Sequence, residues 1–206
     1  MEEKTTTQPA PKEWANPTPA GLVALAVASF CFFALLCGFV EKGALPLLGC
    51  FLLGGFVIQI TVALADLKSG NAAGGNTFLY FSAYFMLVSG LEMFFKYFAT
   101  GLDTRIDGFA WLALMFVVAL WTPAFYKTPA ILFIIVLVLN IAVPCIAFAD
   151  LKIFSAEFSQ VLSYIAGCAL LVCGILAIYL SAAMVVNTTY GREVLKNPKP
   201  FYKGKK

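Results

Sequence analysis

Residues 130–149 read AILFIIVLVLNIAVPCIAFA, a stretch without a single charged side chain. An α-helix rises 1.5 Å per residue, so a stretch of this length matches the roughly 30 Å apolar core of a bilayer. Apolar runs of similar length occur on both sides of it. The six predicted transmembrane helices cover residues 20–40, 45–65, 77–97, 109–126, 130–149 and 158–186. No short alternating strands typical of a membrane barrel are present, so the sequence predicts an all-α membrane protein.

Composition leads to the same class. The chain is 61% hydrophobic and 12% charged, with a mean hydropathy of +0.89, which lies outside the range of soluble domains. No basic face interleaved with aromatic residues occurs, which excludes nucleic-acid binding. We expect one membrane domain at residues 20–186, a loose polar tail at 1–19 without the apolar segment of a signal peptide, and a basic tail at 187–206.

The positive charges predict an orientation. Ten of the 14 lysines and arginines fall on the face that carries both tails, and four fall on the other face. Because positive loops stay in the cytoplasm, we expect both termini to be cytoplasmic. The basic C-terminal tail supplies most of this difference, and its expected role is that of a topology anchor.

The cysteines do not indicate a metal or redox site. The chain has six of them, no Cys-x-x-Cys pair and no histidine. A zinc site or a Ser-His or Cys-His catalytic set cannot be assembled from these residues. We therefore expect no cofactor, no metal and no enzymatic activity.

Polar side chains inside the predicted helices cost free energy in hydrocarbon, so each should face a cavity, another helix or an interface. Five residues from four helices fall at a similar depth, on the order of 8–15 Å from the tail-bearing face. They are Leu25, Gln59, Tyr84, Leu139 and Asn140. Gln59 and Asn140 either line a pore or tie neighbouring helices by hydrogen bonds, and both interpretations remain open.

Two further patterns concern contacts that the predicted helices make, an ion pair and a stripe of small residues. Glu92 is the one acid well inside a predicted helix, and Lys96 follows one turn later, which favours an anchoring ion pair near the helix end over a proton-coupling carboxylate. Gly167, Gly174 and Ser181 recur at seven-residue steps. This smooth face predicts close helix contact, within one protomer or between protomers.

Residues 16–22 read NPTPAGL, directly before the first apolar run. Asn16 is a good helix cap, Pro17 suits the first helical position and Pro19 lies in the first turn. The free N–H groups of that turn would point to the tail-side mouth, where they could hold an anion. The alternative is that these residues only start a helix.

The stretch at residues 15–22 also resembles the signature Asn-Pro-Ala-Pro-Leu-Gly-Leu of the acetate uptake transporter family, the succinate–acetate permease type. Further similar segments follow in order along residues 15–195. They are Gly54 and Gly55 with Gln59, DLKSGN at 66–71, FSAY at 81–84, and YGREVL at 190–195. An ordered set of this kind is more specific than one motif.

The resemblance implies a six-helix protomer with its own pore, assembled as a homo-hexamer in the cell membrane. It implies transport of acetate and related short carboxylates, including succinate, by a channel-like or proton-coupled mechanism. The alternative is an ammonium or neutral small-solute channel. The substrate-binding residues expected from the motif and the depth argument are Asn16, Pro17, Thr18, Pro19, Ala20, Gly21, Gln59 and Asn140.

The family's narrow hydrophobic constriction combines an aromatic residue on the first helix, a tyrosine on the third and a leucine on the fifth. By position these are Leu25, Tyr84 and Leu139. Leu25 replaces the aromatic residue, which predicts a wider pore. The hinge at 70–76 is also about three residues longer than the family pattern.

Overall fold

A computed structural model describes residues 15–202, and all its regular elements are helical. Helix α3 runs on through the π-helix η2 into α4, and the 3-10 segments η1 and η3 extend α2 and α5. The elements are α1 (Thr18–Leu36), η1 (Lys42–Ala44), α2 (Leu45–Lys68), α3 (Ala72–Tyr80), η2 (Phe81–Val88), α4 (Ser89–Phe98), α5 (Arg105–Trp121), η3 (Thr122–Lys127), α6 (Ala130–Leu151) and α7 (Ala156–Tyr190). Within the described range, six helical units are long and apolar enough to cross a membrane, which confirms the predicted fold class.

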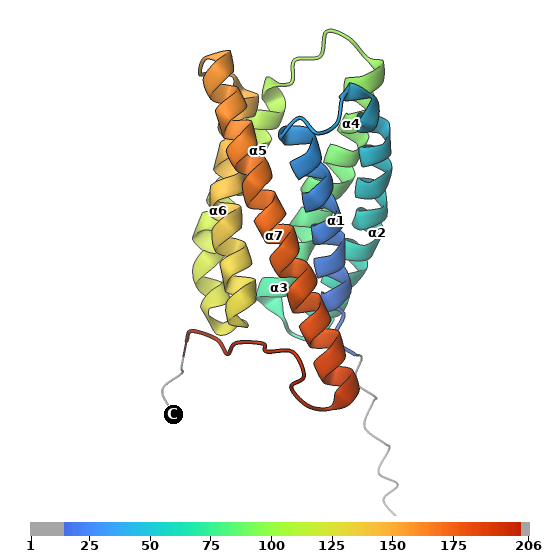
Figure 1. Cartoon of the computed structure of the whole chain (residues 1–206), viewed down its shortest axis with the longest axis vertical. Coiled ribbons are helices and arrows are strands. Elements are labelled where there is room, and N and C mark those ends of the chain that lie inside the picture. Colours follow the sequence, from blue (N-terminus) through green and yellow to red (C-terminus); the bar gives the residue numbers. More distant parts are fainter. Residues whose placement is uncertain (1–14, 203–206) are drawn as a thin grey trace, which may run out of the picture.

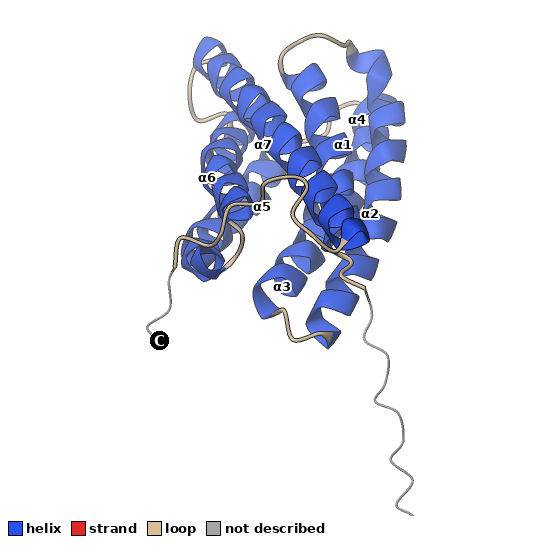
Figure 2. Ribbon diagram, turned by 60° about the horizontal axis from the view of Figure 1, so that its bottom comes forward, coloured by secondary structure: helices blue, strands red, loops and turns tan. Residues whose placement is uncertain are grey.

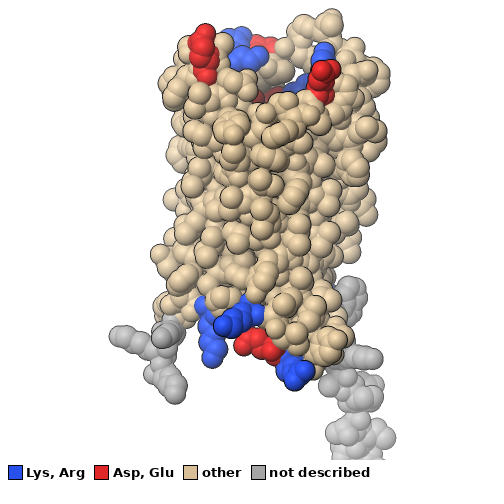
Figure 3. All heavy atoms as spheres, in the orientation of Figure 1, with Lys and Arg blue, Asp and Glu red and all other residues tan. Residues whose placement is uncertain are grey.

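The six units stand side by side as a bundle, with α7 crossing in front of α1 and α6 (Figure 1). We call the end that holds residues 15 and 202 the terminal end, and the end that holds the loops at 37–41, 99–104 and 152–155 the far end (Figure 1). Charged side chains gather at both ends, whereas the flank in view carries none (Figure 3). Such a flank suits contact with lipid chains.

Helix boundaries differ from the predicted ones where local hydrogen bonds decide them. Helix α3 begins at Ala72 rather than at residue 77, because the Asn71 side chain accepts from Gly74 N and caps the helix. Helix α1 ends at Leu36 rather than at residue 40, and α7 continues to Tyr190. Gly191 then ends α7 in the left-handed conformation, with φ of 62°.

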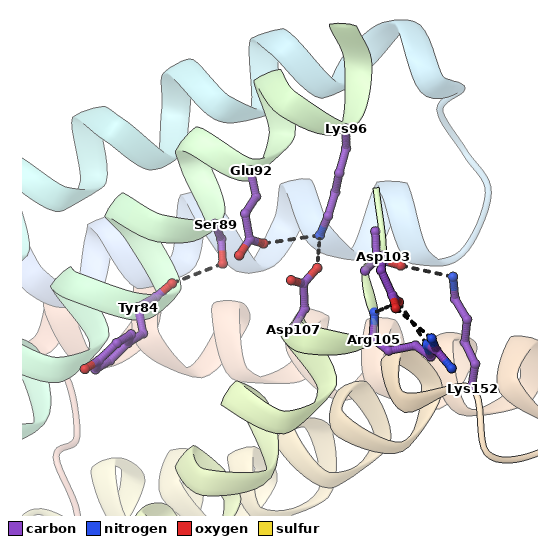
Figure 4. Close-up of polar contacts among 9 residues, drawn as sticks. Tyr84, Ser89, Glu92, Lys96, Asp103, Arg105, Asp107 and Lys152 are labelled. Atoms are coloured by element: carbon purple, nitrogen blue, oxygen red, sulfur yellow. Dashed lines mark hydrogen bonds and ion pairs between the residues drawn. The ribbon is translucent and has the colours of Figure 1, made fainter. Parts of the chain in front are cut away.

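The π-helix in the third span changes which side chains point inward. The Ser89 hydroxyl donates to Tyr84 O, five residues earlier, at 3.1 Å (Figure 4). A π-turn holds more residues than an α-turn, so side chains beyond its start are rotated relative to an α-helix. A regular 3.6-residue period therefore misplaces the residues of this segment.

The small-residue stripe on α7 packs inside the chain. A Cβ atom built at Gly174 would lie 2.8 Å from a ring carbon of Phe30, and one built at Gly167 would lie 2.7 Å from Cys37 Sγ. Ser181 Oγ donates to Pro19 O at 3.0 Å. The predicted close contact is therefore the α1–α7 interface of one protomer.

After α7 the chain turns back across the terminal end (Figure 2). We call residues 191–202 the C-terminal strap. Asn187 Oδ1 accepts from Val194 N at 2.7 Å and from Leu195 N at 2.9 Å. Further along, Pro198 O accepts from Ala130 N at 3.1 Å. The predicted tails also include residues 1–14 and 203–206, which lie outside the described residues.

Candidate functional site

A cavity of about 230 Å³ opens at the terminal end. Its polar mouth comes from the start of α1, the α2–α3 turn and the η3–α6 turn, and its deeper walls are apolar side chains of α1, α6 and α7. Lining residues include Asn16, Thr18, Leu22, Leu25, Gln59, Asn71, Thr77, Phe81, Thr128, Ile135, Leu139 and Leu180. None of the described residues that line this cavity carries a charge.

The start of α1 is held by an internal hydrogen-bond network. Thr18 N donates to Asn16 Oδ1 at 3.0 Å, and the Thr18 hydroxyl reaches the Asp66 carboxylate at 3.4 Å. Asn71 Nδ2 donates to the same carboxylate at 3.2 Å. Asp66 is only 2% exposed. A buried carboxylate of this chain therefore lies beside the positive end of α1, where the sequence suggested a bound anion.

The backbone N–H groups that the sequence predicted as an anion site at the start of α1 are not free. Pro17 and Pro19 have no N–H, Thr18 N is taken by Asn16, and Ala20 N donates to Pro17 O at 3.1 Å. Of the predicted motif residues, Asn16 and Thr18 line the cavity, whereas Pro17, Pro19, Ala20 and Gly21 do not. Gly21 instead packs against Phe78, since a Cβ atom there would lie 2.6 Å from the ring.

Gln59 is the most buried polar residue on the cavity wall. It is 1% exposed, and its Nε2 donates to Gly21 O at 3.5 Å. Its Oε1 has no hydrogen-bond partner within residues 15–202. A buried unpaired oxygen is costly, so this position is available to a ligand that donates a hydrogen bond.

Leu25 and Leu139 line the cavity together, as predicted from their shared depth. Tyr84 does not join them, because it is 51% exposed and lies on another face of the π-helix. Asn140 is also outside the cavity. Its Nδ2 donates to Thr122 Oγ1 at 2.7 Å and to Val136 O at 2.9 Å, which ties α6 to η3.

A second cavity, of about 190 Å³, lies toward the far end. Its polar residues are Ser89, Glu92, Lys96, Asp150 and Ser163, and its apolar walls include Phe32, Phe85 and Trp111. The Glu92–Lys96 pair forms as predicted, with 3.2 Å between Oε2 and Nζ. Asp107 of α5 lies closer, with its Oδ2 at 2.7 Å from Lys96 Nζ (Figure 4).

The contact of Asp107 with Lys96 was not predicted from the sequence, because Asp107 belongs to another span. The three side chains are 25%, 28% and 9% exposed for Lys96, Glu92 and Asp107, so they form a half-buried cluster beside the cavity. At the far-end rim, hydrogen bonds from the Arg105 side chain and backbone lower the pKa of Asp103 to about 2. The far end is therefore strongly polar, unlike the interior.

Aromatic rings separate the two cavities. Phe81 lines the terminal-end cavity, and Phe32 and Phe85 line the far-end cavity. The centroids of Phe81 and Phe85 are 5.6 Å apart in an edge-to-face pair, and Phe32 stacks on Phe85 at 5.2 Å. We call these three residues the aromatic septum. Its sequence signal is the pair of phenylalanines four residues apart, on either side of Tyr84.

An apolar six-helix bundle with a cavity toward each end and a thin aromatic wall between them defines an integral membrane protein with a candidate solute path. No family model matches the chain, and no curated protein matches it by sequence. A solved structure does match, described as "Structure of the bacterial acetate channel SatP". It is 20% identical over 89% of this chain and 99% of that chain, with a TM-score of 0.78. The chain therefore has the fold of that channel, the fold expected from the sequence resemblance.

Proposed function

We propose that this chain transports acetate and related short carboxylates across a membrane. The observation that carries the proposal is the pair of cavities on either side of the aromatic septum, because together they form an interrupted path from one end to the other. The solved structure with the same fold is described as an acetate channel and not as an enzyme, which supports a transport role.

Leu25 and Leu139 form the apolar wall of this path, and Asn16, Thr18 and Gln59 supply its polar groups. A solute passing Leu25 and Phe81 must lose part of its water shell, which favours small molecules with one polar end. The septum rings block the way in this conformation. Rotation of Phe81 or Phe85 about its side-chain bonds is the simplest opening step.

We further propose a homo-hexamer in the cell membrane, with both termini in the cytoplasm. The excess of positive charge on the tail-bearing face supports this orientation. Because each chain contains its own path, transport does not require a central hexamer pore. Channel-like conduction and proton coupling remain the two candidate mechanisms, and succinate is a candidate second substrate.

The direct test is uptake of radiolabelled acetate by proteoliposomes, with and without an imposed pH gradient. We expect saturable uptake that other short carboxylates inhibit. Phe85→Trp enlarges a septum ring and should reduce uptake, whereas Thr61→Val changes an exposed residue and should not. Uptake equal to that of empty liposomes, with correctly assembled protein, would contradict the proposal.

A neutral small-solute channel is the second candidate. The uncharged lining of the terminal-end cavity favours it, because no fixed positive charge there attracts an anion. Under this candidate, uptake of a neutral solute such as urea would exceed acetate uptake, and acetate would not inhibit it.

A further inference from the structure

We propose that the terminal-end cavity binds its substrate as the undissociated acid and not as the carboxylate anion. This inference rests on the proposed function, since it names the chemical form of the carboxylate that the path accepts. The argument comes from the buried acceptor that remains unpaired on the cavity wall and from the absence of charge among the lining residues.

Several of the donors near the cavity already donate within the chain. The Thr18 hydroxyl and Asn71 Nδ2 donate to Asp66, and the Thr128 hydroxyl donates to Phe125 O at 2.8 Å. Gln59 Nε2 donates to Gly21 O, which as a carbonyl can only accept. This contact decides which end of the Gln59 amide faces the cavity.

The buried polar atoms that remain unpaired on the cavity wall favour a ligand that donates a hydrogen bond. Gln59 Oε1 is a pure acceptor without a partner in the described chain. Thr77 Oγ1, on the same wall, is also buried and unpaired there, and a hydroxyl can donate and accept. An undissociated acid can donate its O–H to Gln59 and accept from Thr77. A carboxylate anion would face the Gln59 oxygen with nothing to donate.

Charge leads to the same conclusion. Asp66 lies beside this wall, where Thr18 and Asn71 donate to it, and none of the described residues that line the cavity carries a charge. At the far end, Lys96 lies among the acidic side chains of Glu92, Asp107 and Asp150, so acidic residues outnumber the lysine there. Burying an unpaired anion in either cavity is therefore unfavourable.

The first test measures apparent KM for total acetate in proteoliposomes from about pH 6 to about pH 8, where each unit rise lowers the undissociated fraction about tenfold. We expect KM to rise about tenfold per unit while the maximal flux stays constant. Asp66→Asn should keep this slope, which separates substrate protonation from titration of Asp66. A pH-independent KM with saturable acetate flux would overturn the inference and leave the proposed function intact.

The second test uses acetamide, an isostere with N–H donors that does not titrate. We expect acetamide to inhibit acetate uptake throughout this pH range, with an inhibition constant that does not change with pH. Gln59→Leu should raise the KM for acetate and the inhibition constant of acetamide by the same factor, about tenfold or more. Thr61→Val on the same helix should change neither constant. Failure of acetamide to inhibit wild-type protein contradicts the inference even if Gln59→Leu does not fold. Absence of any acetate flux in wild type would defeat the proposed function and the inference together.

Discussion

At the scale of the residue, hydrogen-bond partners decide roles that residue type leaves open. Gln59 and Asn140 are both amides at a similar depth. Asn140 Nδ2 donates to groups of η3 and α6, whereas Gln59 Oε1 remains unpaired on the cavity wall. Asn16 accepts from Thr18 N at the start of α1, but the N-cap is Pro17, one residue later than the motif predicted. The same motif surrounds a buried carboxylate, Asp66, and not a set of free amides.

Asn16→Ala should destabilise the protein by about 1 kcal/mol, because the Thr18 amide loses its capping oxygen. Thermal unfolding in detergent measures this effect. Asn16→Asp keeps the acceptor and should retain most of the stability. Equal loss in both variants would show that the cap is not what stabilises this helix start.

Lys96→Met should lower the free energy of unfolding by on the order of 3 kcal/mol, more than Asn16→Ala does. The reason is that Glu92 and Asp107 lose the ammonium that both contact. Adding Asp107→Asn to Lys96→Met should recover part of the loss, since one uncompensated carboxylate is removed. Unfolding of the four proteins in a double-mutant cycle measures the coupling. A coupling near zero would mean that the cluster is screened by water.

At the scale of the element, helix geometry sets which positions tolerate bulk. A Cβ atom at Gly108 would lie 2.5 Å from Leu151 N, a backbone atom that cannot turn aside, whereas a Cβ atom at Gly54 meets nothing within 4 Å. The π-helix has a comparable effect on the third span. Phe81, at its first position, lines the cavity, and Tyr84, within it, lies outside.

Gly108→Ala should therefore lower the free energy of unfolding by roughly 1–3 kcal/mol or more, because the added methyl group forces α5 away from α6. Gly54→Ala is the matched control and should be neutral or slightly stabilising, because alanine favours helix. Both are measured by unfolding and by the yield of assembled protein. A loss of assembly in Gly54→Ala would instead show that this open face of α2 contacts another chain.

Substrate range should follow the residues on the cavity wall. Leu139→Ala should raise the ratio of succinate to acetate flux, and Leu25→Phe should lower it, because one widens and the other narrows the apolar path. The packing cost of Leu139→Ala is about 2–5 kcal/mol. Tyr84→Phe should leave the ratio unchanged. A change of ratio in Tyr84→Phe with none in the leucine variants would relocate the constriction to Tyr84.

At the scale of the whole molecule, the C-terminal strap joins α7 to the start of α6 across the terminal end (Figure 2). Asn187 is its main anchor, since its side chain also donates from Nδ2 to Leu195 O at 2.7 Å. Tyr179 OH adds a bond to Lys196 O at 2.9 Å. Near the end of the strap Phe201 packs on Phe133, with ring centroids 5.6 Å apart, whereas the segment at 194–196 is held by the hydrogen bonds to Asn187 and Tyr179.

Asn187→Ala should therefore release the strap without unfolding the bundle. Limited proteolysis with trypsin should cut after Arg192 or Lys196 several-fold faster in the variant than in wild type. Thr189→Ala removes a nearby hydroxyl that bonds only to Val185 O and serves as the control. Equal cleavage rates in all three proteins would show that the strap is already open in solution.

The number and type of spans follow from the sequence alone, because burial of about 20 apolar residues in a bilayer overrides every local preference. The shared depth of Leu25 and Leu139 and the Glu92–Lys96 pair were predictable for a similar reason, since each depends on helical rise or on neighbours within one turn. The tertiary structure decided the rest. Asp107 meets Lys96, Phe81 replaces Tyr84 at the cavity, and Gln59 turns its oxygen inward. These outcomes depend on helix rotation and on partners from other spans, which periodicity and residue type do not encode.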